Sequence, residues 1–144
     1  MTDWNGLLEF MNTEKNFNSH NGIRVTKIED GYCEAEVLLT ANGKNPQGVA
    51  HGSLIFALAD VVTGVAAVTT GKGMLTLSAS INFMHAVADG TVHAVARRVR
   101  EGHTTGVFSA EIYDDAGRLA AVGSFTVYYT GELQLPEDWE KIPK

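Results

Sequence analysis

The sequence predicts a single α+β domain in which a curved antiparallel sheet of about six strands covers one long buried helix. Three observations support this fold class. Residues 52–70 are almost entirely apolar or small, so the helix that they form needs cover on most of its surface. Two strand-like segments precede this helix and four follow it, with no second long helix to supply the cover. The 144 residues suffice for one sizeable core.

The composition is typical of a folded protein, and we treat residues 1–144 as one domain. Hydrophobic residues make up 44% and charged residues 19% of the chain, unlike a disordered protein. The formal charge of -6 argues against a general nucleic-acid binder, which needs a strongly basic face. Cys33 is the only cysteine, so an intrachain disulfide is impossible and a reducing compartment is expected. Without the pattern of a secretory signal at the N-terminus, a cytoplasmic protein is the simplest expectation.

The elements before the long helix follow from spacing and turn residues. Apolar side chains three and four residues apart predict a short amphipathic helix over residues 3–11. Residues 23–28 show an imperfect strand alternation that ends at Asp30-Gly31, and residues 32–39 are the expected hairpin partner. Residues 41–50 contain two glycines, two asparagines and a proline, which predicts a loop.

The apolar helix over residues 52–70 is not expected to span a membrane, because Asp60 interrupts it and it is shorter than the ~20 apolar residues that a bilayer requires. Gly71-Lys72-Gly73 then predicts a turn, without the further residues of a phosphate-binding loop. Four strands are expected after it, over residues 74–87, 91–100, 104–113 and 118–129, the last two joined by a hairpin turn at 114–117. The tail, residues 131–144, is expected to be peripheral.

An antiparallel sheet curled round such a helix is the hot-dog arrangement, the economical way to cover it. Asp60 then needs an explanation, because we expect this carboxylate to be buried, where an unpaired charge costs several kcal/mol. A structural carboxylate that caps a loop or pairs with an arginine is the simpler alternative. Eight residues upstream, however, the helix begins at Gly52, and first-turn N–H groups without intrahelical acceptors form an oxyanion donor site.

A motif over residues 45–60 gives this pairing a context. Asn45-Pro-Gln-Gly48-Val-Ala-His51-Gly52-Ser53, followed by Leu58-Ala59-Asp60, closely resembles the Asn-x-x-Gly-x-x-His-Gly-Gly…Leu-Ala-Asp signature of the phenylacetate-pathway (PaaI-type) hot-dog acyl-CoA thioesterases. Residues 80–84 resemble the central strand of that family and residues 100–106 a hairpin after its fourth strand, so the resemblance covers roughly residues 20–130. In two departures, Ser53 replaces the second glycine, and His85-Ala86 replace a basic residue and a proline. The first is expected to narrow the pocket, and the second bears on the substrate class.

The resemblance implies a role for each motif residue. The Gly52 N–H would donate a hydrogen bond to the thioester carbonyl, with Asn45 helping to hold the thioester end of the substrate. Asp60, contributed by the partner subunit in this family, would be the nucleophile or the general base for water, and both roles remain open. His51 would support the loop and the helix start, and Thr76 would position the water. No metal and no cofactor are expected, because the CoA is part of the substrate.

Cations are needed for the phosphates of CoA. The densest basic cluster comprises Arg97, Arg98, Arg100 and His103, although a solvated strand face is an equally good interpretation of it. Lys44 and Lys72 flank the expected site, and Ser53 is a further candidate for contact with the substrate. Three aromatic residues are expected to pack as core or lid, or to line the acyl pocket: Trp4, Phe10 and Phe17.

The sequence therefore predicts hydrolysis of acyl-CoA thioesters, with an aromatic acyl group such as phenylacetyl or a medium-chain one. The enzyme is expected to be a homodimer, or a homotetramer built as a dimer of dimers, with its sites at the subunit interface. A non-catalytic acyl-CoA sensor or scaffold that uses the same pocket is the alternative. Neither nucleic-acid binding nor membrane insertion is expected.

Overall fold

The structure, a computed structural model, describes residues 3–13 and 16–135. It contains a central helix α3 (Gly52–Val68), two short helices, α1 (Trp4–Met11) and α2 (Phe17–His20), and a 3-10 turn, η1 (Ala41–Gly43). The strands are β1 (Ile23–Glu29), β2 (Tyr32–Leu38), β3 (Lys72–Phe83), β4 (Thr91–Glu101), β5 (Thr105–Tyr113) and β6 (Leu119–Glu132). They form one sheet in the order β1-β2-β4-β5-β6-β3, and every neighbouring pair is antiparallel.

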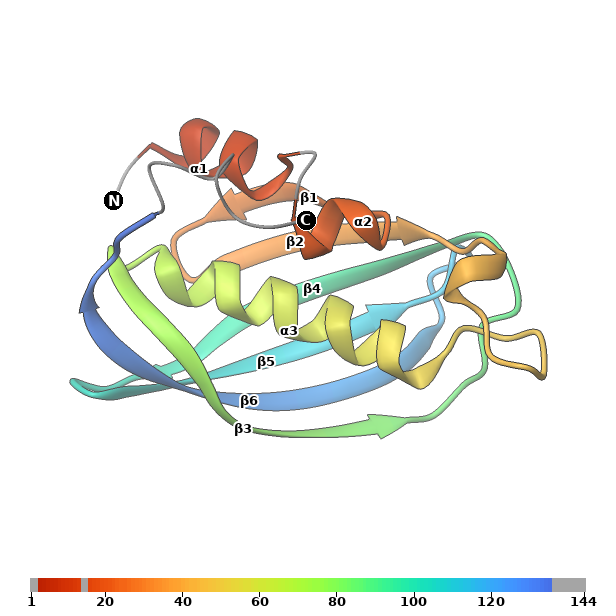
Figure 1. Ribbon diagram of the computed structural model, residues 1–144. Coiled ribbons are helices and arrows are strands. Elements are labelled where there is room, and N and C mark those ends of the chain that lie inside the picture. Colours follow the sequence, from red (N-terminus) through yellow and green to blue (C-terminus); the bar gives the residue numbers. More distant parts are fainter. Residues whose placement is uncertain (1–2, 14–15, 136–144) are drawn as a thin grey trace.

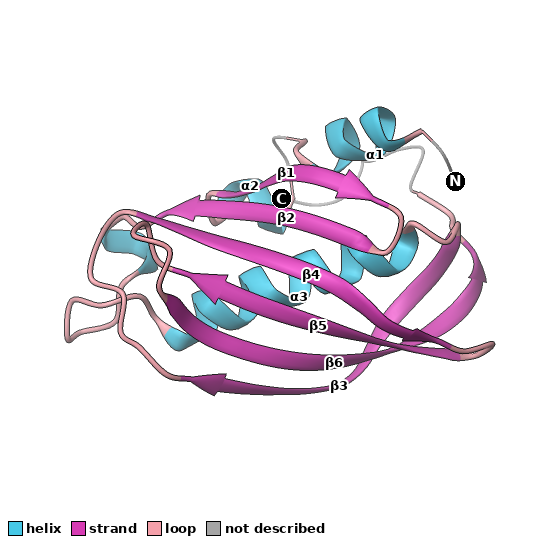
Figure 2. Cartoon of the chain, turned by 180° about the vertical axis from the view of Figure 1, so that it is seen from behind, coloured by secondary structure: helices cyan, strands magenta, loops and turns pink. Residues whose placement is uncertain are grey.

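The sheet curves round α3, as Figure 1 and Figure 2 show from opposite sides. Side chains alternate between the two faces of a strand, and in β5 every second residue from Gly106 to Ile112 is buried against the helix. Phe108 of β5, Phe125 of β6 and Leu58 of α3 are completely buried and form the centre of the core. The predicted α+β hot-dog architecture is thereby confirmed. No helix among the described residues is long and apolar enough to cross a bilayer.

Helix α3 is not buried on all sides, contrary to the sequence prediction. After its first turn, the residues that remain unburied are Phe56, Ala57, Asp60, Val61 and Gly64. Their spacing of three and four places them on one side of the helix. The predicted burial of Asp60 is therefore wrong for the single chain. The physical reason is that the sheet ends at β3, so one side of α3 remains uncovered between β3 and the N-terminal helices (Figure 1).

Helix α3 ends two residues earlier than predicted because two threonine hydroxyls donate to carbonyls of its last turn. Thr69 Oγ1 lies 2.7 Å from the Ala66 oxygen, and Thr70 Oγ1 lies 3.0 Å from the Ala67 oxygen. Such local side-chain bonds compete with the helical ladder. Gly71, at φ 84°, then reverses the chain. Strand β3 begins at once, so Lys72 is the first residue of a strand and not part of a turn.

The elements differ from the prediction by more than one residue in three other places. Helix α2 was not predicted, because four residues are too few to show a helical period. Strand β3 ends at Phe83, and the N–H groups of Met84 and His85 turn to the Ala120 oxygen, so residues 84–87 are not a strand. Strand β6 continues to Glu132, so the predicted peripheral tail is wrong for its first residues. Its last part, residues 136–144, lies outside the described residues.

Candidate active site

The loop that leads into α3 is folded by Asn45. The side-chain oxygen of Asn45 accepts hydrogen bonds from the N–H groups of Gln47 at 2.9 Å and Val49 at 3.3 Å. An Asn side chain that binds the backbone a few residues further on stabilises a turn of this kind. Asn45 lines none of the three cavities described below. Its contact with the thioester stays a prediction, while its observed contacts shape the loop.

His51 caps the start of α3. Its Nδ1 accepts a hydrogen bond from the Ser53 N–H at 3.0 Å, and its carbonyl accepts from Leu54 and Ile55. Because Nδ1 can accept only through a lone pair, the proton of the neutral ring is on Nε2. His51 thus caps the first turn and occupies the N–H of Ser53.

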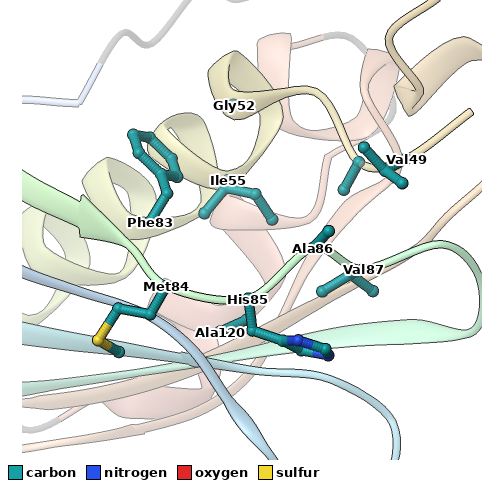
Figure 3. Close-up of a pocket in the computed structure, with 10 residues that line it drawn as sticks. Val49, Gly52, Ile55, Phe83, Met84, His85, Ala86, Val87 and Ala120 are labelled. Atoms are coloured by element: carbon teal, nitrogen blue, oxygen red, sulfur yellow. The ribbon is translucent and has the colours of Figure 1, made fainter. Parts of the chain in front are cut away.

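The Gly52 N–H is left without a hydrogen-bond acceptor among the described residues. It is one of the first-turn donors for which a helix has no intrahelical partner. Beside it stands the ring of Phe83, and a Cβ built on Gly52 would lie 3.7 Å from that ring, an ordinary contact. Figure 3 shows Phe83 next to this first turn. A free donor at a helix start is well suited to an oxygen that develops negative charge.

Asp60 lies two turns further along α3 and meets strand β3. The hydroxyl of Thr76 donates to Asp60 Oδ1 at 2.7 Å. The hydroxyl has one proton, which this bond uses, so its lone pairs remain available to accept from a water molecule. The structure therefore brings together two of the predicted catalytic residues, one from the open side of α3 and the other from the edge strand.

Two cavities meet at Gly52. One, of about 680 Å³, is lined by Gly52 and Asp60 together with three phenylalanines, Phe17, Phe56 and Phe83. The other, of about 320 Å³, is also lined by Phe83 and includes His85 and Ala86, the second departure from the family signature (Figure 3). This departure thus lies in a cavity that Gly52 also lines. His85 Nε2 is 3.5 Å from Asp114 Oδ2.

Gly52 and Asp60 share a cavity but cannot act on the same carbonyl within one chain. Eight residues separate them on a helix that rises 1.5 Å per residue, so their backbones are about 12 Å apart along the axis. An aspartate side chain spans only a small part of that length. One thioester cannot reach both the Gly52 N–H and the Asp60 carboxylate of a single protomer.

The predicted CoA-binding arginines and His103 lie at the other end of the molecule. They belong to the end of β4 and the turn that follows, next to the C-terminal end of α3 (Figure 1). Arg97 lies over the Tyr32 ring, with Cζ 5.0 Å from the ring centroid, while Arg100 and His103 are exposed. None of the four residues lines a cavity that contains Gly52 or Asp60.

Arg98 has a structural role in this arrangement. Its guanidinium donates to both carboxylate oxygens of Asp30, at 3.0 and 3.3 Å. These hydrogen bonds hold the pKa of the Asp30 carboxyl below its usual value. Since the charge of Arg98 is already paired, the observed contacts favour the structural interpretation of this residue over phosphate binding.

The two lysines differ in position. Lys72 Nζ lies 4.8 Å from the centroid of the Tyr129 ring, four residues before Thr76 on an extended strand and hence on the order of 13 Å away. Lys44 lines a third cavity, of about 910 Å³, together with His51 and Ser53. Of the predicted cations, Lys44 is the one that the structure brings close to the helix start.

Sequence reasoning missed several residues of the Asp60 cavity. Phe56, Ala57 and Val61 share the helix face of Asp60, so helical spacing from that residue would have found them. Asn18 gave no signal, because it belongs to the unpredicted α2. Of the three aromatic residues proposed as core, lid or pocket, Phe17 lines the cavity, whereas Trp4 packs against the core.

Residues 47–121, slightly more than half of the chain, match the thioesterase superfamily. The chain belongs to this family. One relative is the proofreading thioesterase EntH of Cronobacter turicensis, 30% identical over 115 residues that cover 78% of this chain and 84% of that protein. The prediction of a thioester hydrolase is confirmed.

Two solved structures share the fold of this chain. The Escherichia coli PaaI protein from the phenylacetic acid degradation operon superimposes with a TM-score of 0.81 at 23% identity, covering 89% of this chain and 92% of that one, which shows the shared fold. A Streptococcus mutans protein solved with bound acetyl CoA is 28% identical, with a TM-score of 0.75 over 78% of this chain and 91% of that one. The predicted resemblance to PaaI-type hot-dog thioesterases is confirmed.

Proposed function

We propose that this protein hydrolyses acyl-CoA thioesters as a dimer in which two protomers complete each site. Gly52 of one protomer donates its N–H to the thioester carbonyl. Asp60 of the partner subunit acts on the carbonyl carbon, directly or through water. The observation that carries this proposal is the separation of about 12 Å between Gly52 and Asp60 within one chain. A backbone N–H and a carboxylate are the groups that thioester hydrolysis needs, but within a single protomer they are too far apart to act on the same thioester.

The unpaired edge of the sheet supports the proposal that a second protomer binds there. Strand β3 pairs with β6 on one side only, and among the described residues no strand pairs with its other side. This edge is twelve residues long and carries Leu75 and Leu77, which are 64% and 60% exposed. A long apolar edge is a template for pairing with another chain. A second copy of β3 would satisfy it.

A two-fold axis gives this contact the required geometry. In a symmetric dimer the same patch faces itself, so the open side of α3 and the edge of β3 meet their own copies. When the axis is perpendicular to α3, the two copies of the helix run in opposite directions. The start of one α3 can then lie beside the middle of the other, which brings Gly52 to Asp60 of the partner subunit.

The chemistry needs only the groups already described. Water, hydrogen-bonded to Thr76 and deprotonated by the Asp60 carboxylate, adds to the carbonyl carbon while the oxygen gains negative charge at the Gly52 N–H. The carbon–sulfur bond then breaks, and the CoA sulfur leaves and takes up a proton, giving acid and free thiol. In the alternative route the Asp60 carboxylate attacks the carbonyl carbon, the carbon–sulfur bond breaks and the CoA thiolate leaves and takes up a proton, and water then cleaves the resulting anhydride to the acid and the free carboxylate.

The cavity favours an apolar acyl group. Three phenylalanine rings and Val61 line it beside Asp60, and pockets of a few hundred Å³ with a few polar groups are typical of small-molecule sites. The acetyl CoA bound to the Streptococcus mutans relative supports the CoA thioester as the substrate class. An aromatic group such as phenylacetyl, or a medium-chain acyl group, suits these walls.

Gly52→Pro tests the oxyanion donor. Proline removes the N–H, is well tolerated at the first position of a helix, and follows a residue already extended, since His51 has φ -64° and ψ 135°. Loss of one such donor is expected to lower kcat by about 10²–10³-fold. Gly52→Ala, which keeps the N–H, is the control for bulk. Equal activity of both variants in a thiol-release assay over several acyl-CoAs would contradict the assignment.

Mixed dimers test whether the Gly52 and Asp60 of one site come from different protomers. Asp60→Asn and Gly52→Pro homodimers are each expected to retain at most about a hundredth of the wild-type activity. When the two are unfolded, mixed equally and refolded together, about half of the dimers are mixed and each has one intact site, so roughly a quarter of wild-type activity should return. No recovery would place both groups in one protomer. Binding of acyl-CoA by the wild type without turnover would instead support the sensor hypothesis.

A further inference from the structure

The third cavity has no part in the reaction proposed above, yet it adjoins the Asp60 cavity. It lies between α2, η1, the end of β2 and the first turns of α3, and its volume is about 910 Å³. The two cavities have four lining residues in common: Phe17, His51, Ser53 and Ala57. His51 and Ser53 are fixed by the helix cap, and Ala57 has a single methyl group. Phe17 is therefore the one large side chain at the boundary that can be moved or removed.

Phe17 is held at this boundary by its backbone and not by the core. Helix α2 has no buried residue, and a reciprocal capping box between Asn16 and Ser19 holds its start. At its end, Asn21 Nδ2 donates to the Phe17 carbonyl at 2.8 Å. The Phe17 side chain is 61% exposed. An exposed aromatic ring between two hollows is a surface that a ligand can cover.

The walls of the third cavity suit hydrocarbon better than the CoA nucleotide. Eight of the fifteen lining residues are polar or basic, but Leu38, Leu54 and Ala57 add an apolar strip to the ring of Phe17. Phe17 and Ala57 also line the Asp60 cavity, and Leu38 is 63% exposed. The basic residues along the lining are Lys44, His20 and His51, and His51 Nδ1 is already occupied by the Ser53 N–H, which leaves few cations for a nucleotide that carries several phosphate charges. The strip therefore points to an acyl chain as the occupant.

We propose that Phe17 sets the length limit of the acyl group. Short or compact acyl groups stay in the Asp60 cavity in front of the ring, whereas a long chain can enter the third cavity only when the ring is displaced. This inference rests on the proposed function, since it assumes an acyl-CoA in the Asp60 cavity. It assigns the specificity to a residue of α2 that contributes nothing to the chemistry.

Phe17→Ala tests this limit against butyryl-, octanoyl-, dodecanoyl- and hexadecanoyl-CoA. The ratio of kcat/KM for hexadecanoyl-CoA to that for butyryl-CoA is expected to rise by about tenfold or more, because added methylenes gain apolar contact. Val99→Ala, which shortens an equally exposed apolar residue that lines none of the three cavities, should leave the ratio unchanged. Phe17 is at the surface, so the variant should retain its fold, as its melting temperature will show.

A charge placed in the third cavity provides a second test of the inference. Leu38→Asp places a carboxylate on the apolar strip: it should cancel the gain of Phe17→Ala and leave the profile of the wild type unchanged. An unchanged ratio in Phe17→Ala, or an equal change for all four substrates, would overturn the inference, the latter because the ring would then contact the CoA part. Affinities for the corresponding S-alkyl-CoA thioethers give the same ratio without turnover. Absent hydrolysis with a shifted affinity ratio would refute the proposed reaction and leave the length limit standing.

Discussion

The two edges of the sheet are built in opposite ways. At one edge, β1 has seven residues and an irregular register between Val25 and Lys27. There the side chain of Asn12 fills the gap: its Nδ2 donates to the Val25 carbonyl and its Oδ1 accepts from the Val25 N–H, both at 2.9 Å. At the other edge, β3 is long and apolar, and no described strand or helix covers its outer side.

This difference distinguishes an edge that ends the sheet from an edge that continues it. A bulge, a nearby charge and a covering segment are the devices by which proteins prevent edge-to-edge pairing, and β1 has all three. Strand β3 has register irregularities of its own, between Gly73 and Met74 and between Thr76 and Ser78, but no described segment covers its outer side. It also carries Thr76, the hydroxyl that binds Asp60. The edge left open is the one next to the candidate site, as expected if pairing completes that site.

The largest effect on activity is expected from a substitution that prevents pairing at the β3 edge. Leu75→Lys places a charge on the β3 edge and should convert the dimer to a folded monomer with kcat lowered by about hundredfold or more, since each site loses half of its groups. Light scattering and thiol release measure the two effects together. Thr26→Lys, on the exposed side of β1, is the matched control and should change neither. A monomeric Leu75→Lys protein with full activity would refute the shared site.

A smaller effect, on stability alone, is expected from removing the side chain that covers the β1 edge. Asn12→Ala leaves both backbone groups of Val25 without their partner, which should cost about 1–2 kcal/mol of unfolding free energy. Chemical denaturation measures this loss. Dimer mass and kcat should stay as in the wild type, because β1 lies far from β3 in the strand order. A change in oligomeric state would mean that β1 also takes part in pairing.

The smallest effect concerns the ion pair that ties the β1–β2 hairpin to β4. Since Arg98 lowers the pKa of Asp30, the pair stabilises the fold above the ordinary aspartate pKa of about 3.9, and this contribution is lost as the pH falls through the depressed value. Asp30→Asn should lower the melting temperature slightly at neutral pH, and the difference should vanish in acid. Asp89→Asn, an exposed aspartate, is the control. A difference that persists once Asp30 is protonated would show that the ion pair is not its cause.

Much of the fold and of the site followed from local pattern. The apolar run of α3, the strand alternation and the turn residues at 30–31 and 114–117 predicted the architecture, because each reports a period or a backbone requirement that neighbouring residues share. The motif around Gly52 and Asp60 predicted the chemistry. Phe83 joined the cavity without such a signal, and lining the pocket was only one of the alternatives open for Phe17. Both residues lie far from Asp60 in the sequence and reach it only through the packing of β3 and α2.

By itself, the sequence determined the α+β class, the position of the long helix and the identity of its one carboxylate, because these depend on the chemistry of consecutive residues. Only the tertiary structure decided that this carboxylate lies on an open side of the helix, next to Thr76 and beside an uncovered strand. The strand order sets which side of α3 remains uncovered, and that order depends on contacts between distant segments. The separation of Gly52 and Asp60 indicates a site shared by two protomers only when the structure shows that both residues line the same open cavity.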